Sequence, residues 1–367
     1  MKIAFIIDKT QTLPTILKVL KLSLRKGHDC TLYCCFTKED LGSASDYLTQ
    51  ELIEKIKWVY DSDRNLLVKA LGRERNNYDA VFGINFFNSS LNPIYKNSRV
   101  TNYSFEYCWN EIYNQVESFE SEGTIFSNTE YSKKAIIGLS GYKKVISLGS
   151  PWFEFLSENK AEPKRKIVFM APHNSFYQHK RGLHEDVKNI LKSVRSYCDT
   201  NETELWLKTR SKYSNVEKQY VNFDNIVSDR LACSNIDTYK DSCLVINFCS
   251  SAVNELAYLE VPYLIIGPEI QRGLHTNRRC SMGIQKLHNQ YYSGNIIDNT
   301  HCASLSLENN FGFNLVTSKI DMLINSTKDW SNFQINFFDK NHIGSSDRIL
   351  RYVENEVAKS KPSDFNK

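Results

Sequence analysis

Proline is scarce in this chain, with 8 copies in 367 residues, and long uninterrupted hydrophobic runs are missing. The lack of proline-rich or low-complexity tracts excludes a fibrous or largely disordered protein. No stretch reaches the roughly 18 apolar residues that cross a bilayer. The apolar run at the N-terminus ends at Asp8, which is too early for a signal peptide. We therefore expect a cytoplasmic globular protein, for which peripheral contact with the inner face of a membrane stays open.

The ten cysteines are not spaced like a zinc site or a disulfide framework, because no CxxC pair occurs. Cys30, Cys34 and Cys35 lie in one apolar run, and Cys243 and Cys249 lie in another. This placement predicts buried free thiols in a reducing compartment. A surplus of one charge is also lacking, since 46 Lys and Arg against 42 Asp and Glu leave a net charge of +4. We expect no nucleic-acid partner, because such a partner needs a concentrated basic surface.

Several nucleotide and hydrolase motifs are absent as well. There is no P-loop, no GxSxG and no HExxH, and the first loop, residues 8–12, lacks the GxGxxG of dinucleotide-binding proteins. The sequence therefore predicts no bound dinucleotide or other resident cofactor. We also expect no Asp-x-Asp pair that would hold a divalent cation beside a diphosphate, so we expect metal-independent chemistry.

Short apolar runs recur along the first half of the chain. Residues 3–7 and 30–36 are typical of parallel strands that are covered on both faces, and residues 13–24 between them have helical spacing. Strand, helix and strand in this order form a βαβ unit with a right-handed crossover. Further strands are predicted at residues 57–60, 80–84, 124–127 and 144–147, with a helix near 65–71. Residues 1–156 are therefore predicted to be a Rossmann-like domain.

Residues 157–166 are highly charged, contain a proline and lack apolar periodicity, which predicts a linker between domains. Ile167 to Ala171 then repeats the pattern of a buried strand, and a second Rossmann-like domain is predicted over residues 167–340. Its predicted strands lie at 204–208, 225–227, 243–248 and 263–266, and its predicted helices at 183–198 and 252–259. The expected fold class is α/β with two such domains, which places a ligand cleft between them and at the carboxyl ends of their strands.

The start of the predicted helix at 252–259 is the first candidate binding site. An apolar strand runs into Ser250 and Ser251, and the helix follows directly. Free backbone N–H groups and the positive end of the helix dipole suit a phosphate or diphosphate. Asn254 and Glu255 lie about one turn further on, where a side chain can reach a ribose or sugar hydroxyl. The alternative is that one of the serines only caps the helix.

Two other predicted strand ends in the same half carry polar residues. His173, Asn174 and Ser175 follow the strand at 167–171, while Lys208 and Arg210 close the strand that begins at Glu204. A lysine and an arginine together supply a point charge and a bidentate fork for phosphate oxygens. Each of these residues alone is typical of a solvated loop, but together they favour a phosphate site.

Two carboxylates are candidates for the catalytic base in the first domain. Asp8 follows the first predicted strand, and Glu106 lies among aromatic residues between Tyr103 and Trp109. Desolvation in such a setting raises the pKa of a carboxyl group toward neutrality, as a general base requires. The alternative for either residue is a surface ion pair or a helix cap.

Ser127 to Lys134, Gly141 to Ile146 and Leu148 to Glu154 together resemble the end of the N-terminal domain in glycosyltransferases of the GT-B fold. The resemblance is to the branch of capsule and lipopolysaccharide Kdo transferases and CDP-glycerol glycerophosphotransferases, which has a Ser-Ser pair like Ser250 and Ser251. Two departures favour a glycosyl donor over glycerophosphate. Phe248-Cys249 stands where the branch has an Asp, and Lys208-Thr209-Arg210 stands where it often has His-Pro-Arg.

The resemblance implies an inverting, metal-independent glycosyltransferase that moves a sugar from a CMP-, CDP- or UDP-linked donor to a glycan or glycolipid acceptor at the cell surface. It implies that the second domain holds the donor, and that residues 341–367 form a helix crossing back to the first domain. From the sequence, Ser346 can cap this helix, which is predicted from Asp347 to Val357. A glycerophosphotransferase, a sugar-nucleotide epimerase of the same fold and a non-catalytic sugar-binding or scaffold protein remain alternatives.

Overall fold

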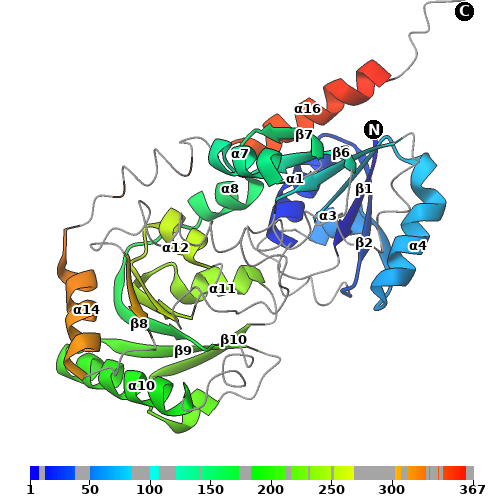
Figure 1. The fold of residues 1–367 in the computed structure, drawn as a ribbon. Coiled ribbons are helices and arrows are strands. Elements are labelled where there is room, and N and C mark those ends of the chain that lie inside the picture. Colours follow the sequence, from blue (N-terminus) through cyan, green and yellow to red (C-terminus); the bar gives the residue numbers. More distant parts are fainter. Residues whose placement is uncertain are drawn as a thin grey trace, which may run out of the picture. The chain divides into compact units, whose positions relative to one another are not determined.

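The computed structural model describes residues 1–7, 13–37, 50–84, 100–106, 121–139, 142–172, 183–210, 216–229, 232–248, 252–267, 302–306, 313–327, 330, 338 and 342–360. The chain divides into two compact units, drawn in Figure 1. The first unit consists of Met1–Glu158, Leu231–Cys233 and Ile335–Lys367, and the second of Asn159–Arg230 and Ser234–Gln334. Each unit holds a parallel β-sheet with helices, which confirms the predicted α/β class. None of the helices in the described ranges is long and apolar enough to cross a membrane.

The sheet of the first unit has the strand order β3-β2-β1-β4-β5-β6-β7, in which every pairing is parallel. Its strands are β1 (Lys2–Ile7), β2 (Asp29–Cys34), β3 (Lys57–Tyr60), β4 (Ala80–Ile84), β5 (Thr101–Phe105), β6 (Ser121–Ser127) and β7 (Tyr142–Ser147). Its helices are α1 (Leu13–Arg25), α3 (Gln50–Glu54), α4 (Arg64–Glu74), α7 (Glu130–Leu139), α8 (Pro151–Ser157) and α16 (Ser345–Ser360), with a 3-10 turn at Arg75–Asn77.

Apolar side chains cover both faces of this sheet, as the continuous apolar run of β1 predicts. Ile3, Phe5 and Ile7 pack with α1, α3 and α16 on one face, while Ala4 and Ile6 pack with α4 on the other. β5 alternates more clearly, because Tyr103 and Phe105 enter the α1 and α16 core and Ser104 between them faces the opposite side.

The second unit has the strand order β10-β9-β8-β11-β12-β13, again with parallel pairings. Its strands are β8 (Lys164–Met170), β9 (Glu204–Arg210), β10 (Asn225–Asp229), β11 (Ser242–Asn247), β12 (Tyr263–Gly267) and β13 (Cys302–Ser306). Its helices are α10 (Leu183–Thr200), α11 (Ala232–Tyr239, from Ser234 on), α12 (Val253–Leu259) and α14 (Phe313–Asn325), with a 3-10 turn at Val216–Gln219. The helices α10 and α14 cover one face of this sheet, and α11 and α12 lie on its other side (Figure 1).

Strand β8 begins at Lys164, three residues before the strand predicted at Ile167, so the end of the predicted linker belongs to the sheet. The charged residue Lys166 is part of the strand because its side chain is buried and paired. Lys166 is 3% exposed, forms an ion pair with Asp241 and lies 4.4 Å from the ring centre of Trp206. Paired in this way, a lysine can occupy a strand position that reads as linker in the sequence.

Helix α16 begins at Ser345, and Ser346 does not cap it as predicted. The Ser346 hydroxyl and backbone amide instead donate to Glu154 Oε2 of α8, at 2.6 and 2.9 Å. Gly344 N donates to Glu154 Oε1 at 2.9 Å, and the Ser345 hydroxyl donates to Oε2 at 3.1 Å. One carboxylate thus accepts from the backbone N–H of Ser346 in the first turn and of Gly344 just before it, and meets the positive end of the helix dipole.

A buried histidine lies beside this contact. Ser150 N donates to His342 Nδ1 at 3.0 Å, and the other ring nitrogen contacts the carbonyl oxygen of Phe338. Burial lowers the pKa of His342 to about 4, so the ring is neutral at pH 7. Its Nδ1 therefore acts as an acceptor, which fixes the chain just before α16 against the start of α8.

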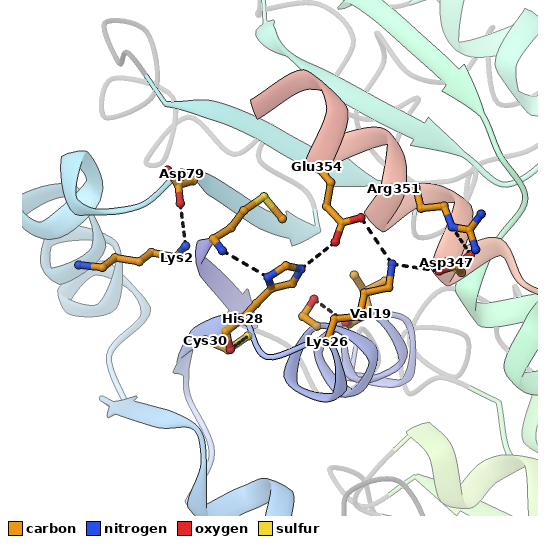
Figure 2. A network of polar contacts seen from close by, with 11 residues as sticks. Lys2, Val19, Lys26, His28, Cys30, Asp79, Asp347, Arg351 and Glu354 are labelled. Atoms are coloured by element: carbon orange, nitrogen blue, oxygen red, sulfur yellow. Dashed lines mark hydrogen bonds and ion pairs between the residues drawn. The ribbon is translucent and has the colours of Figure 1, made fainter. Parts of the chain in front are cut away.

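More exposed polar contacts join the first turn and the middle of α16 to the residues between α1 and β2 (Figure 2). His28 Nε2 lies 2.9 Å from Glu354 Oε1, and Lys26 Nζ lies 3.1 Å from Asp347 Oδ1. The N-terminal amine of Met1 lies 3.3 Å from His28 Nδ1. Pairs in contact with solvent contribute little individually, so apolar packing and the Glu154 contact carry most of the docking of α16.

We expect Glu154→Gln to loosen α16, because an amide nitrogen faces backbone donors where the carboxylate accepts. The variant should lose about 2 kcal/mol of local stability, since hydrogen bonds to a charged group are lost. Hydrogen exchange of peptides from 345–360 measures this loss. Glu354→Gln is the matched control and should cost about 1 kcal/mol or less. Equal protection in both variants would contradict this assignment.

Candidate functional site

Glu106 directly follows β5, at the carboxyl edge of the first sheet. Its backbone amide donates to Phe126 O of β6 at 3.0 Å, so it continues the parallel pairing of the strand. The side chain is 2% exposed. Asn128 N donates to Glu106 Oε2 at 2.6 Å, while Oε1 is buried and has no hydrogen-bond partner among the described residues. The two oxygens of this carboxyl group therefore differ, because only one of them is held by a hydrogen bond.

The amide that holds Glu106 is positioned by the start of α7. Thr129 Oγ1 accepts from Ser132 N at 2.9 Å, and Ser132 Oγ accepts from Thr129 N at 2.9 Å. This reciprocal pair resembles a capping box and fixes the first turn of the helix. Asn128 lies between β6 and this turn, so its N–H is directed at the carboxylate. The segment Ser127 to Lys134, one of the three that carry the family resemblance, thus lies beside Glu106.

Burial raises the pKa of Glu106 to about 7 from an ordinary value of 4.5. The hydrogen bond from Asn128 and the Ser132 hydroxyl act in the opposite direction and only partly compensate for the loss of solvent. A carboxyl group with this pKa can take up or release a proton near neutral pH, which is the property that a general base needs.

Two polar residues lie near the carboxyl ends of β9 and β11, on one face of the second sheet. Lys208 of β9 is 8% exposed, and Asn247 of β11 is fully buried. Met170 of β8 lies between them in the sheet, because Met170 pairs with Lys208 and β8 pairs with β11 on its other side. Charged and amide groups at the carboxyl edge of a parallel sheet are well placed for an anionic ligand.

Glu255 of α12 is held by a neighbouring helix. The hydroxyl of Tyr239, the last residue of α11, donates to Glu255 Oε2. The Tyr239 side chain is fully buried, whereas Glu255 is half-buried. A rigid phenol thus orients a carboxylate that was predicted to reach a ribose or sugar hydroxyl.

The turn before α12 differs from the prediction in one respect. The helix begins at Val253, and Ala252 occupies the N-cap position without a side-chain hydrogen bond. The backbone of Asn254 lies in this helix and that of Arg210 ends β9, but neither side chain is described. The other predicted residues lie outside the described ranges: Asp8, His173, Asn174, Ser175, Ser250 and Ser251. Their roles stay predictions.

Asp61 and Asp63 form an Asp-x-Asp pair that the sequence interpretation overlooked. Asp63 caps α4 by accepting from Asn65 N at 2.8 Å, and Asp61 Oδ1 accepts from Asp63 N at 2.8 Å. Both carboxylates therefore organise a turn. In the part of the chain that the structure describes, no three His, Cys, Asp or Glu side chains gather as a metal-binding group.

Sequence reasoning missed Ser104, Asn247 and Tyr239. The signal for Asn247 is a polar residue that closes an otherwise apolar strand. For Ser104 the available signal is its spacing from Glu106, because residues two apart on a strand share a face. Nothing in the sequence pairs Tyr239 with Glu255, which come together through the packing of α11 and α12.

We expect Glu106 to make the stability of the first unit depend on pH. Because its folded pKa of about 7 exceeds 4.5, its contribution is complete below pH 4.5 and is lost as the pH rises through 7. This loss amounts to about 3 kcal/mol. As the pH rises from 4.5 to 7, Glu106→Gln should therefore become more stable relative to the wild type. Above pH 7 the difference in free energy of unfolding between the two proteins should stay constant.

Hydrogen exchange of peptides covering β6 and α7, measured from pH 4 to 8, tests this difference. Glu51→Gln is the control, because Glu51 is exposed and its pKa is lowered by Lys55. A difference between Glu106→Gln and wild type that does not change with pH would contradict the assignment.

Comparisons with family models and with curated proteins found no match. Solved structures match over nearly the whole chain. A putative UDP-N-acetylglucosamine 2-epimerase from Listeria monocytogenes has a TM-score of 0.62 at 13% identity and covers 100% of this chain and 99% of its own. S. aureus MnaA with UDP has a TM-score of 0.61 at 14% identity, with 100% of each chain covered.

UDP-GlcNAc 2-epimerase from Neisseria meningitidis, bound to UDP-GlcNAc, has a TM-score of 0.55 at 13% identity and covers 97% of this chain and 100% of its own. At these identities the comparisons show the fold and not the activity. The chain has the GT-B fold of two Rossmann-like domains.

Proposed function

We propose that this protein is an enzyme that acts on a nucleotide sugar, with Glu106 as the base that receives a proton from a sugar hydroxyl. The observation that carries the proposal is the buried carboxyl of Glu106, which has one oxygen held by Asn128 N and the other unpartnered among the described residues. A buried carboxyl group with one unpartnered oxygen lowers the stability of the fold, and groups with strongly shifted pKa values are concentrated at active sites.

The reaction that fits a single base of this kind is glycosyl transfer with inversion. The acceptor hydroxyl oxygen bonds to the anomeric carbon of the donor, the bond from that carbon to the nucleotide phosphate breaks, and the hydroxyl proton passes to Glu106. The electron pair of the broken bond leaves with the nucleotide, whose negative charge must be stabilised by fixed donors.

Groups of the second unit are candidates for that stabilisation. Lys208 supplies a positive charge and Asn247 an amide at the carboxyl edge of the sheet. Arg210, His173 and the backbone around Ser250 and Ser251 are the further residues that the sequence predicts for the phosphates, with Asn174, Ser175 and Asn254 beside them. Glu255, oriented by Tyr239, is placed to accept from a ribose or sugar hydroxyl.

UDP or a UDP-sugar as ligand is supported by two solved structures of the same fold, S. aureus MnaA with UDP and the Neisseria enzyme with UDP-GlcNAc. They favour a uridine donor over a cytidine donor. The finer expectation, transfer to a capsule or lipopolysaccharide glycan at the inner face of a membrane, rests on the family resemblance of residues 127–154 and on Ser250 and Ser251.

A sugar-nucleotide 2-epimerase is the second candidate, because two of the solved structures named above carry that name. The two reactions differ in the bonds that break. Epimerisation at C2 breaks the C2–H bond and returns the nucleotide sugar, whereas transfer releases the nucleotide and leaves C2 unchanged. In D2O an epimerase therefore incorporates deuterium at C2 without any acceptor.

The test is to incubate the full chain with UDP-GlcNAc and with a panel of UDP-, CMP-, CDP- and GDP-sugars and CDP-glycerol in D2O. We expect release of free UDP, slow with water alone, and no deuterium at C2. Deuterium at C2 would favour the epimerase, and release of CMP from CDP-glycerol would favour a glycerophosphotransferase. Neither turnover nor saturable binding of any compound would contradict the proposal and favour a non-catalytic role.

Glu106→Gln should reduce kcat at least 100-fold, because it removes the proton acceptor while preserving size. The Kd for UDP should stay unchanged, and Glu51→Gln should behave like the wild type. In the wild type, kcat/KM should rise with pH and level off above pH 7, since the base acts only when it is deprotonated. Full activity of Glu106→Gln would place the base elsewhere, with Asp8 the next candidate.

A further inference from the structure

Two buried polar atoms lie without partners on the same face of β5. Ser104 Oγ and Glu106 Oε1 are both inaccessible to solvent and form no hydrogen bond within the described ranges. Ser104 is 3% exposed. Alternation along the strand places both side chains on one face, since Tyr103 and Phe105 enter the hydrophobic core on the other.

The paired strands offer the Ser104 hydroxyl no polar side chain. Its register neighbours are Gly83 on β4 and Ile125 on β6. Glycine has no side chain and isoleucine no polar atom. Folded proteins rarely leave a buried hydroxyl unpaired, because the group loses its bonds to water and gains none in return. The Ser104 hydroxyl therefore keeps its full capacity to donate to and accept from a ligand atom.

We propose that Ser104 and Glu106 together bind one hydroxyl group of the sugar substrate, with the substrate oxygen donating to Glu106 Oε1 and accepting from Ser104 Oγ. The inference rests on the proposed function and deepens it by naming a second substrate-binding residue. Side chains two positions apart on a strand are separated by about 6.6 Å at their Cα atoms. A hydroxyl oxygen that forms two bonds of about 2.8 Å can bridge such side chains.

Glu106 and Ser104 have different roles in this arrangement. Glu106 Oε1 takes the proton of the substrate hydroxyl, and the Ser104 hydroxyl donates to the oxygen as negative charge develops on it. Serine can do this because its hydroxyl is both donor and acceptor. The bond from Ser104 also fixes which lone pair of the substrate oxygen remains free to attack.

The inference predicts opposite effects of Ser104→Ala on stability and on turnover. The free variant should melt at a higher temperature than the wild type, because a buried unpaired hydroxyl is removed. Its kcat/KM with UDP-GlcNAc should fall about 3- to 30-fold for the loss of one substrate hydrogen bond. The Kd for UDP should not change, and Ser104→Thr, which keeps the hydroxyl, should recover most of the turnover.

Ser23→Ala is the matched control. Ser23 is also a buried serine of the first unit, but its hydroxyl donates to Val19 O at 2.8 Å. This variant should lose stability, because the buried hydrogen bond from Ser23 Oγ to Val19 O is lost, and keep wild-type turnover. A Ser104→Ala protein that is destabilised like Ser23→Ala would show that the hydroxyl is paired within the fold, which overturns the inference.

The remaining outcomes separate the inference from the proposed function. If the wild type turns over a nucleotide sugar and Ser104→Ala is equally active, the inference fails and the proposed function stands. If the wild type neither binds nor turns over any compound of the panel, both fail together. Stabilisation with reduced turnover, restored by Ser104→Thr, supports both.

Discussion

The candidate active site depends on one hydrogen bond, from Asn128 N to Glu106 Oε2, at the carboxyl edge of the first sheet. The bond holds a carboxyl group that is otherwise removed from water, and burial outweighs it in setting the pKa near 7. Its direction depends on the turn into α7, where Thr129 and Ser132 bond reciprocally. The opposite oxygen stays available, and Ser104 on the same face of β5 presents a second unpaired group in the described structure.

The two units contain different kinds of chemical group for the proposed reaction. In the proposal, the first unit supplies Glu106 as a desolvated proton acceptor, and Lys208 and Asn247 of the second unit are candidates for binding an anion. Polar groups in both units lie at the carboxyl ends of parallel strands, where such sheets commonly bind ligands. Docking of α16 by Glu154, Ser345 and Ser346 makes the C-terminal helix part of the first unit. The stability of that unit therefore depends on residues nearly 200 positions apart.

The sequence was most informative where hydrophobicity decides the structure. The apolar run of β1 predicts a covered parallel strand, which the structure confirms, but β5, with Thr101, Asn102 and Ser104, has no such run and was not predicted. Lys164 and Lys166 resemble linker residues in the sequence, because the ion pairs with Asp241 that neutralise them form only in the folded structure. Glu106 could be proposed from its aromatic neighbours. For Ser104 the only signal is its spacing from Glu106, because an unpaired hydroxyl is visible only when its surroundings are known.

The central claim is that Glu106 is a carboxyl group that exchanges its proton near neutral pH. Carbon-13 NMR of the protein labelled at glutamate Cδ measures this directly, with Glu106→Gln identifying the resonance. The account predicts one glutamate carboxyl that titrates with a midpoint near pH 7 and disappears in the variant. A Glu106 resonance that titrates near pH 4.5, as an ordinary exposed glutamate does, would contradict it.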